Sequence, residues 1–182
     1  MKYYSAGLAI LIAFIIVSCK NEKENALNEE IQKRKNQVPQ LNNPTNPAVE
    51  NLNSKIMTEF TPEQKLIKDK VTAVIYENLE ATQAEDIDGI LKTIHYDETK
   101  KSPTVNGMKY IFENYDLEYK LENIQFLSIS ENEAKVLYQQ TTKSISGEGF
   151  MNIRTIGIHT VKKSKDGKWR IYKTENVSTN PL

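Results

Sequence analysis

The sequence predicts an α+β domain in which helices are followed by a curled four-stranded antiparallel sheet. From residue 61 to about residue 82, apolar residues recur at three- and four-residue spacing, which indicates one buried helical stripe. From residue 116 onward they alternate with polar residues instead, as in strands. Short turns separate these alternating runs, so the strands form a meander that must curl around the long helix to cover its stripe.

The first predicted helix has a clear beginning. Thr61 can cap it, Pro62 suits its first position, and Gln64 follows three residues after Thr61 to complete a capping box. Its apolar stripe consists of Ile67, Val71, Val74, Ile75 and Leu79. A second, shorter helix is expected from residue 85, with an apolar face of Ile87, Ile90, Leu91 and Ile94, and a third over residues 103–115, with Met108, Ile111 and Phe112 inward.

Four strands are expected after the helices. They cover residues 117–129, with a bulge, then 134–146, 150–163, and a last strand that starts at Trp169. Asp166-Gly167 gives the strongest hairpin signal, because this pair tolerates the positive φ of a tight turn. Trp169 should pack against the first helix or a neighbouring strand.

The amino terminus has the features of an export signal. A short positive start precedes an apolar run over residues 6–17, which is too short for a membrane span of about 20 residues. The run ends at Val17-Ser18-Cys19, which resembles the lipobox of bacterial lipoproteins. The resemblance implies cleavage after residue 18, acylation of the Cys19 thiol and attachment to a membrane. An uncleaved anchor with an incidental cysteine is the alternative.

The residues after Cys19 bear on location and organisation. Lys20 gives no inner-membrane retention signal of the Asp type, and the charged stretch 20–25 resembles signals that send some lipoproteins to the cell surface. We therefore expect a protein that is exported and lipid-anchored to the outer membrane. Residues 19–57 are rich in Asn and Pro and poor in apolar residues, which predicts a flexible spacer, or a docking segment, before a domain over residues 58–182.

Composition excludes several classes of function. Lys+Arg and Asp+Glu are both 24, and opposite charges alternate along the chain, so no basic field would attract nucleic acid. One cysteine and two histidines exclude an internal disulfide framework and leave too few ligands for a structural zinc site. We expect neither a metal nor a cofactor.

Two segments carry a family resemblance. Residues 84–90, after a long first helix, and the run 160–171 resemble the nuclear transport factor 2-like and SnoaL-like superfamily, over about residues 61–178. The resemblance implies a cone-shaped domain with a cavity between the concave face of the sheet and the helices. Members include isomerases, dehydratases and cyclases as well as non-catalytic binding and dimerising modules, so the fold leaves the chemistry open.

Five residues are candidates for the lining of such a cavity. A histidine placed like His95 can act as a general base in the resembling enzymes, although a histidine bound to the free carbonyls of a helix end would look the same. His159 lies on the third strand and points either to the cavity or to solvent. Tyr110 and Tyr138 could line a cavity or pack at the core edge, and Gln140 lies on a strand that is polar on both faces.

The function that follows is a lipid-anchored module of the cell envelope that binds a small molecule or another envelope protein without catalysis. The first alternative is a small isomerase or dehydratase that uses His95 or His159. The second is a structural homodimer. No strand acid stands where a ketosteroid-isomerase type of base would be needed, and no G-x-S-x-G nucleophile motif is present.

Overall fold

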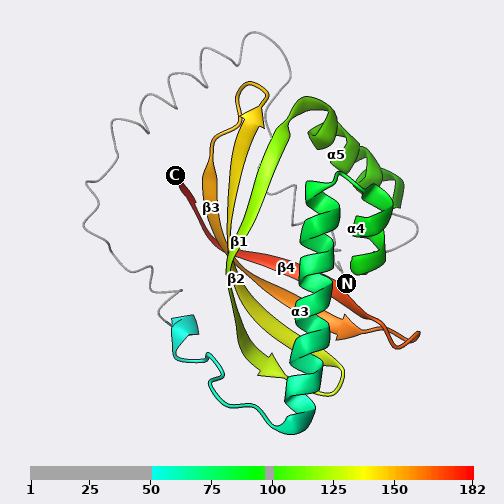
Figure 1. Cartoon of the computed structure of the whole chain (residues 1–182), viewed down its shortest axis with the longest axis vertical. Coiled ribbons are helices and arrows are strands. Elements are labelled where there is room, and N and C mark those ends of the chain that lie inside the picture. The colour runs from blue at the N-terminus through cyan, green and yellow to red at the C-terminus, as the bar shows by residue number, and fades with distance from the viewer. Residues whose placement is uncertain (1–50, 97–100) are drawn as a thin grey trace, which may run out of the picture.

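The computed structural model describes residues 51–96 and 101–182. Helices α3, α4 and α5 precede strands β1 to β4, and the helices lie together on one side of the sheet (Figure 1). The helices are α3 (Pro62–Gln83), α4 (Ile87–Thr93) and α5 (Lys101–Asn114). The strands are β1 (Asp116–Ile129), β2 (Glu133–Ser146), β3 (Ile153–Lys163) and β4 (Trp169–Pro181). The predicted order of helices followed by a four-stranded antiparallel sheet is confirmed.

Local signals set the helix ends. At the start of α3, the Gln64 N–H donates to the Thr61 hydroxyl at 3.3 Å, and the Thr61 N–H donates to Gln64 Oε1 at 3.0 Å, so both halves of the predicted capping box form. Glu85 reverses the chain after α3 with a φ of 55°. Asp86 then caps α4 by accepting a hydrogen bond from the Gly89 N–H at 3.0 Å.

The sheet is a meander in the order β1-β2-β3-β4. The predicted start of the third strand at Phe150 is wrong, because β3 begins at Ile153. Gly147 and Gly149 both adopt positive φ, at 101° and 84°, and open a wide turn. Asn152 holds this turn by accepting a hydrogen bond from the Ser144 N–H at 2.8 Å.

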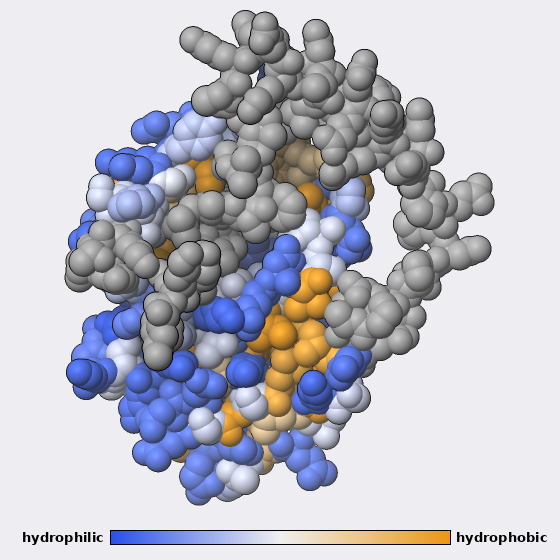
Figure 2. All heavy atoms as spheres, turned by 180° about the vertical axis from the view of Figure 1, so that it is seen from behind, coloured by the Kyte–Doolittle hydropathy of each residue, from blue (hydrophilic) through white to orange (hydrophobic). Residues whose placement is uncertain are grey.

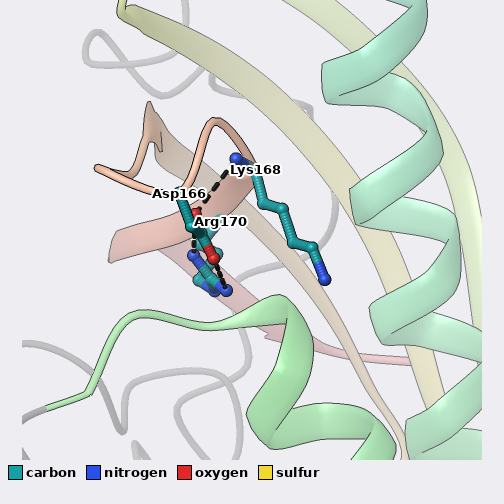
Figure 3. A network of polar contacts seen from close by, with 3 residues as sticks. All are labelled: Asp166, Lys168 and Arg170. Atoms are coloured by element: carbon teal, nitrogen blue, oxygen red, sulfur yellow. Dashed lines mark hydrogen bonds and ion pairs between the residues drawn. The ribbon is translucent and has the colours of Figure 1, made fainter.

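A bidentate ion pair fixes the hairpin between β3 and β4. Both carboxylate oxygens of Asp166 accept from the Arg170 guanidinium, at 2.9 and 2.7 Å, and Oδ1 also accepts from the Lys168 N–H at 3.1 Å (Figure 3). These hydrogen bonds, from Arg170 first, hold the pKa of Asp166 well below its usual range. The Asp166 side chain therefore stabilises the Asp-Gly turn that the sequence predicts, in addition to the positive φ of Gly167.

We call the face of the sheet that packs against α3 and α4 the inner face. Its apolar part meets the stripe of α3 in one core, which includes Val71, Val74, Ile75, Phe126, Val136, Val161, Trp169 and Ile171. The predicted stripe is confirmed at its centre, while Ile67 and Leu79 at its ends are half-buried. Seen from behind, the molecule shows a strip of apolar residues between hydrophilic flanks (Figure 2).

The segment before α3 belongs to the packed domain. The Met57 N–H donates to the Phe126 carbonyl at 2.8 Å, and the Phe60 ring meets the Phe126 ring edge-on with centroids 6.2 Å apart. Residue 57, which the sequence assigned to the spacer, is therefore tied to β1. Residues 1–50, with the predicted signal peptide, Cys19 and most of the spacer, lie outside the described residues. Within the described ranges, no helix is both long and apolar enough to cross a membrane.

Truncation of Trp169 tests the core. Its ring is 8% exposed and belongs to the core cluster, so Trp169→Ala should lower the free energy of unfolding by about 3–5 kcal/mol. Urea denaturation measures this loss. Leu66→Ala, at an exposed position of α3, is the control and should cost far less. Equal losses in the two variants would contradict this description of the core.

Candidate functional site

The inner face changes from apolar to polar along β2. Side chains two residues apart on a strand share a face, so Ala134 and Val136 continue into Tyr138, Gln140 and Thr142. Ala134 and Val136 belong to the core cluster. The register pairs the polar residues of β2 with Gly157 and other residues of β3 that lie on the same face. One end of the inner face is therefore core, and the other end carries hydrogen-bonding groups.

Three side chains form a buried polar cluster where the two parts meet. The rings of Tyr138 and His159 stack, with centroids 4.1 Å apart and an interplanar angle of 9°. His159 Nδ1 lies 2.8 Å from Thr174 Oγ1 on β4. Their exposed fractions are 6%, 5% and 6% for Tyr138, His159 and Thr174. We call these three residues the inner-face cluster.

Gly157 makes room for this cluster. It pairs with Tyr138 across β2 and β3, and the tyrosine ring lies over it. A Cβ atom added at Gly157 would stand 2.5 Å from Tyr138 Oη and 2.6 Å from two ring carbons. Such contacts are too short for any side chain, so glycine serves here for close approach.

Burial keeps both rings uncharged. It lowers the pKa of His159 to about 3, because the imidazolium ion would lose its hydration. Burial also raises the pKa of Tyr138 to about 12, because the phenolate ion would lose its hydration. At neutral pH the cluster therefore consists of a neutral imidazole, a phenol and an alcohol.

Several polar atoms of the inner face have no partner. Within residues 51–96 and 101–182, neither His159 Nε2 nor Tyr138 Oη makes a hydrogen bond to another residue. The Tyr119 hydroxyl on β1 is buried and also has no partner there. Burial, with a smaller effect of the Glu85 carboxylate, raises the pKa of Tyr119. Of these three atoms the Tyr119 hydroxyl oxygen alone is fully buried, while His159 Nε2 and Tyr138 Oη keep some contact with solvent.

The structure brings together three of the five candidates from the sequence. Tyr138 and His159 are in contact, and His159 is buried, which excludes the alternative of a sheet-surface histidine. Gln140 comes next on the inner face of β2, half-buried, and its amide donates to Thr142 Oγ1 at 3.4 Å. That any of them binds a ligand stays a prediction.

His95 and Tyr110 lie outside the inner-face cluster. The second helix ends at Thr93, and Ile94 pairs with Ile171 of β4. In this extended segment side chains alternate, so Ile94 is buried and His95 is exposed, with its ring 5.2 Å from that of Tyr172. His95 follows the C-cap residue of α4, and within the described residues its ring makes no hydrogen bond to the carbonyls at that helix end.

Tyr110 lies on the outer side of α5. The inward positions of this helix are Thr104, Met108 and Ile111. Each residue turns the helix by about 100°, which directs Tyr110 away from these positions, and 44% of its surface is exposed. Its position is therefore typical of a surface tyrosine.

Sequence reasoning missed Thr174, Gly157 and Tyr119. Alternation counted from Ile171 would have placed Lys173 inward, but a bulge inserts one residue, so Thr174 faces His159 instead. The signal for Gly157 was a glycine inside a run of β-branched residues, which often marks close backbone approach.

The arrangement favours hydrogen bonding over proton transfer. A general base works best with a pKa near the operating pH, and His159 lies more than three units below it. No carboxylate in the described part of the chain hydrogen-bonds to His159 or Tyr138. The same residues contain no group of three or more His, Cys, Asp or Glu side chains that could hold a metal ion.

Solved structures share this fold at low sequence identity. A provisionally named scytalone dehydratase of Novosphingobium aromaticivorans superposes with a TM-score of 0.51 and 13% identity, over 68% of this chain and 92% of that one. The hexachlorocyclohexane dehydrochlorinase LinA-type3 of Novosphingobium barchaimii gives 0.51 and 12%, over 66% and 92%. The domain thus has the fold, helices followed by a curled antiparallel sheet, that the resemblance to the nuclear transport factor 2-like superfamily implied.

A family model places the chain more narrowly. The model of the anti-sigma-I factor RsgI9 C-terminal domain matches residues 73–182, and this chain belongs to that family. Anti-sigma-I factor RsgI9 of Acetivibrio thermocellus is 35% identical over 102 residues. The match covers 56% of this chain and only 14% of RsgI9, so most of that protein has no counterpart here.

Acid denaturation tests the buried imidazole. The pKa of His159 is about 3 in the folded chain and about 6.5 when unfolded, so its contribution to stability is complete above pH 6.5 and is lost as the pH falls toward 3. Between pH 7 and pH 5 this loss should be about 2 kcal/mol. Urea titrations at several pH values should show it in the parent chain and not in His159→Gln.

The exposed His95 provides the matched control. His95→Gln removes the other histidine and leaves the inner-face cluster intact, so the loss of stability between pH 7 and pH 5 should persist in this variant. If His159→Gln shows the same pH dependence as the parent chain, His159 is not buried as a neutral ring.

Proposed function

We propose that this protein is a lipid-anchored component of the cell envelope whose domain binds a small molecule at the inner-face cluster without transforming it. The observation that carries the proposal is the pair of unused polar atoms, His159 Nε2 and Tyr138 Oη, on two side chains that are more than nine-tenths buried. The fold is compatible with it, since one fold can serve catalysis or binding and the site decides between them.

His159 Nε2 and Tyr138 Oη keep some contact with solvent although their side chains are otherwise buried, so a ligand could replace water as their hydrogen-bond partner. A hydrogen bond of this kind contributes about 0.5–1.5 kcal/mol. Gly157 keeps the tyrosine ring in place against the imidazole, so the two groups are already oriented before a ligand arrives. Preorganisation of this kind favours affinity because little side-chain entropy remains to be lost.

The enzyme alternative is weaker on this geometry. His159 is a poor base, and His95 lies on the surface beside Tyr172 rather than with the cluster. Isomerase or dehydratase chemistry needs a group that takes up a proton near the operating pH. The cluster offers only groups that remain neutral there.

A role in sigma-factor regulation is the second candidate, since the relative in Acetivibrio thermocellus is an anti-sigma-I factor. The matching region is the C-terminal domain of that factor. An acylated Cys19 would hold the domain outside the cytoplasm, away from any sigma factor. We therefore favour ligand binding as the activity that the shared domain would contribute in both proteins.

Lipid attachment is tested at Cys19. The apolar run that ends at Val17-Ser18-Cys19 predicts acylation of the thiol. Radiolabelled palmitate should enter the parent chain in cells, and Cys19→Ala should abolish the label and stop normal processing. Label that persists in Cys19→Ala would contradict lipidation at this residue, and envelope fractionation would then locate the unmodified chain.

Ligand binding is tested by a metabolite screen that follows the melting temperature of the full chain. For each metabolite that raises it, Tyr138→Phe and His159→Gln should weaken binding, while the matched surface variants Tyr110→Phe and His95→Gln should leave it unchanged. Product analysis of each hit distinguishes binding from catalysis. Conversion of a hit that depends on either histidine would contradict the proposal.

A screen without any hit would also contradict ligand binding. Docking to an envelope protein or formation of a homodimer would then be the remaining predictions. Cross-linking in envelope fractions and the molecular mass in solution distinguish these two. The apolar strip in Figure 2 is the kind of surface on which protein partners dock.

A further inference from the structure

The hydroxyl of Thr174 determines where the proton of His159 lies. This hydroxyl is buried, and within the described residues His159 Nδ1 is the partner that stands within hydrogen-bonding distance, at 2.8 Å. If Nδ1 carried the proton, it would donate to Thr174 Oγ1, and the hydroxyl proton would have no acceptor. If Thr174 donates instead, both atoms are satisfied. In the second arrangement the proton of the ring lies on Nε2, which is not fully buried, so this N–H can donate to solvent while the Thr174 hydroxyl donates to Nδ1.

This choice fixes the tautomer of the neutral ring. With Nδ1 as an acceptor, the proton of His159 lies on Nε2, which has no partner in the described part of the chain. The Tyr138 hydroxyl is protonated as well and also has no partner there. Two neutral donors, one from each of two stacked rings, are therefore left without acceptors.

The charged side chains of the sheet lie elsewhere. Three charged residues of β3 and β4 project from the opposite face of the sheet, because their strand partners alternate with the inner-face positions. These residues are Lys162, Lys173 and Glu175. Their ion pairs, Lys162 with Glu133 at 2.9 Å and Lys173 with Glu175 at 2.6 Å, lie there too. An anionic group placed at the inner-face cluster would lose its hydration without meeting a cation, which is costly.

We propose that the inner-face cluster is selective for an uncharged ligand that presents a carbonyl oxygen, which accepts hydrogen bonds from His159 Nε2–H and Tyr138 Oη–H. This inference rests on the proposed binding function and adds the chemical class of the ligand. Thr174 is a positioning residue in it, because it acts on the ligand only through the tautomer of His159.

Nuclear magnetic resonance of the full chain with 15N-labelled histidine tests the tautomer. Long-range 1H–15N correlations should show His159 as the Nε2–H form, and His159→Gln assigns the signal. Thr174→Val removes the donor to Nδ1, so its spectrum should show a larger fraction of the Nδ1–H form. A parent chain in the Nδ1–H form would overturn the inference.

Acetamide and acetate test the ligand class, because the two molecules have nearly the same shape and differ in charge. Acetamide should shift the His159 Nε2 resonance in a saturable manner, and acetate at the same concentration should not. Tyr138→Phe should weaken the acetamide response by about three- to tenfold, which corresponds to one lost hydrogen bond. Tyr110→Phe is the matched control and should leave the response unchanged.

The two proposals can fail separately. A response to acetate equal to that of acetamide, or no response to either, would overturn the uncharged-carbonyl inference, and the latter would mean that the donors bind only water. An anionic metabolite whose binding needs Tyr138 would overturn this inference and leave the binding function standing. Conversion of a carbonyl metabolite would contradict non-catalytic binding while leaving the ligand class supported.

Discussion

A neutral imidazole buried between a tyrosine ring and a threonine hydroxyl is the constraint on which the polar part of the inner face depends. His159 loses its hydration on folding and recovers one hydrogen bond, to Thr174, and one stacked contact, to Tyr138. The second nitrogen, Nε2, makes no hydrogen bond within the described residues but is not fully buried, so it can take a further partner. The strands that hold the three side chains are β2, β3 and β4, so the cluster exists only when these strands have the observed register.

Two features of the sheet bring the three side chains of the inner-face cluster together. The bulge in β4 places Thr174 opposite His159, where simple alternation would have placed Lys173. Gly157 removes the side chain that would otherwise occupy the space under the Tyr138 ring. The apolar part of the inner face, which packs on α3, supplies most of the stability and anchors the same strands. The core and the inner-face cluster therefore occupy different parts of one face.

The order of helices and strands could be predicted from the sequence, but the residues that meet in the inner-face cluster could not. Helical periodicity and capping are local properties, so Thr61, Val71 and the Asp166 turn could be interpreted within a few residues. The inner-face cluster depends on pairing between residues far apart in the chain, and each bulge shifts which residues face inward. The sequence therefore could not show which face of the sheet His159 lies on. It also could not show that Ile94, the residue before His95, pairs with Ile171 of β4.

The chain belongs to the family of the RsgI9 C-terminal domain, and the region that it shares with RsgI9 covers 14% of that relative. The neutral state of His159 is the claim on which this account rests. The most direct measurement is a pH titration of the His159 Hε1 proton resonance by nuclear magnetic resonance, assigned with His159→Gln. The account predicts no titration between pH 8 and pH 5, because burial holds the pKa at about 3. A titration midpoint near the value of about 6.5 for an unperturbed histidine would contradict it.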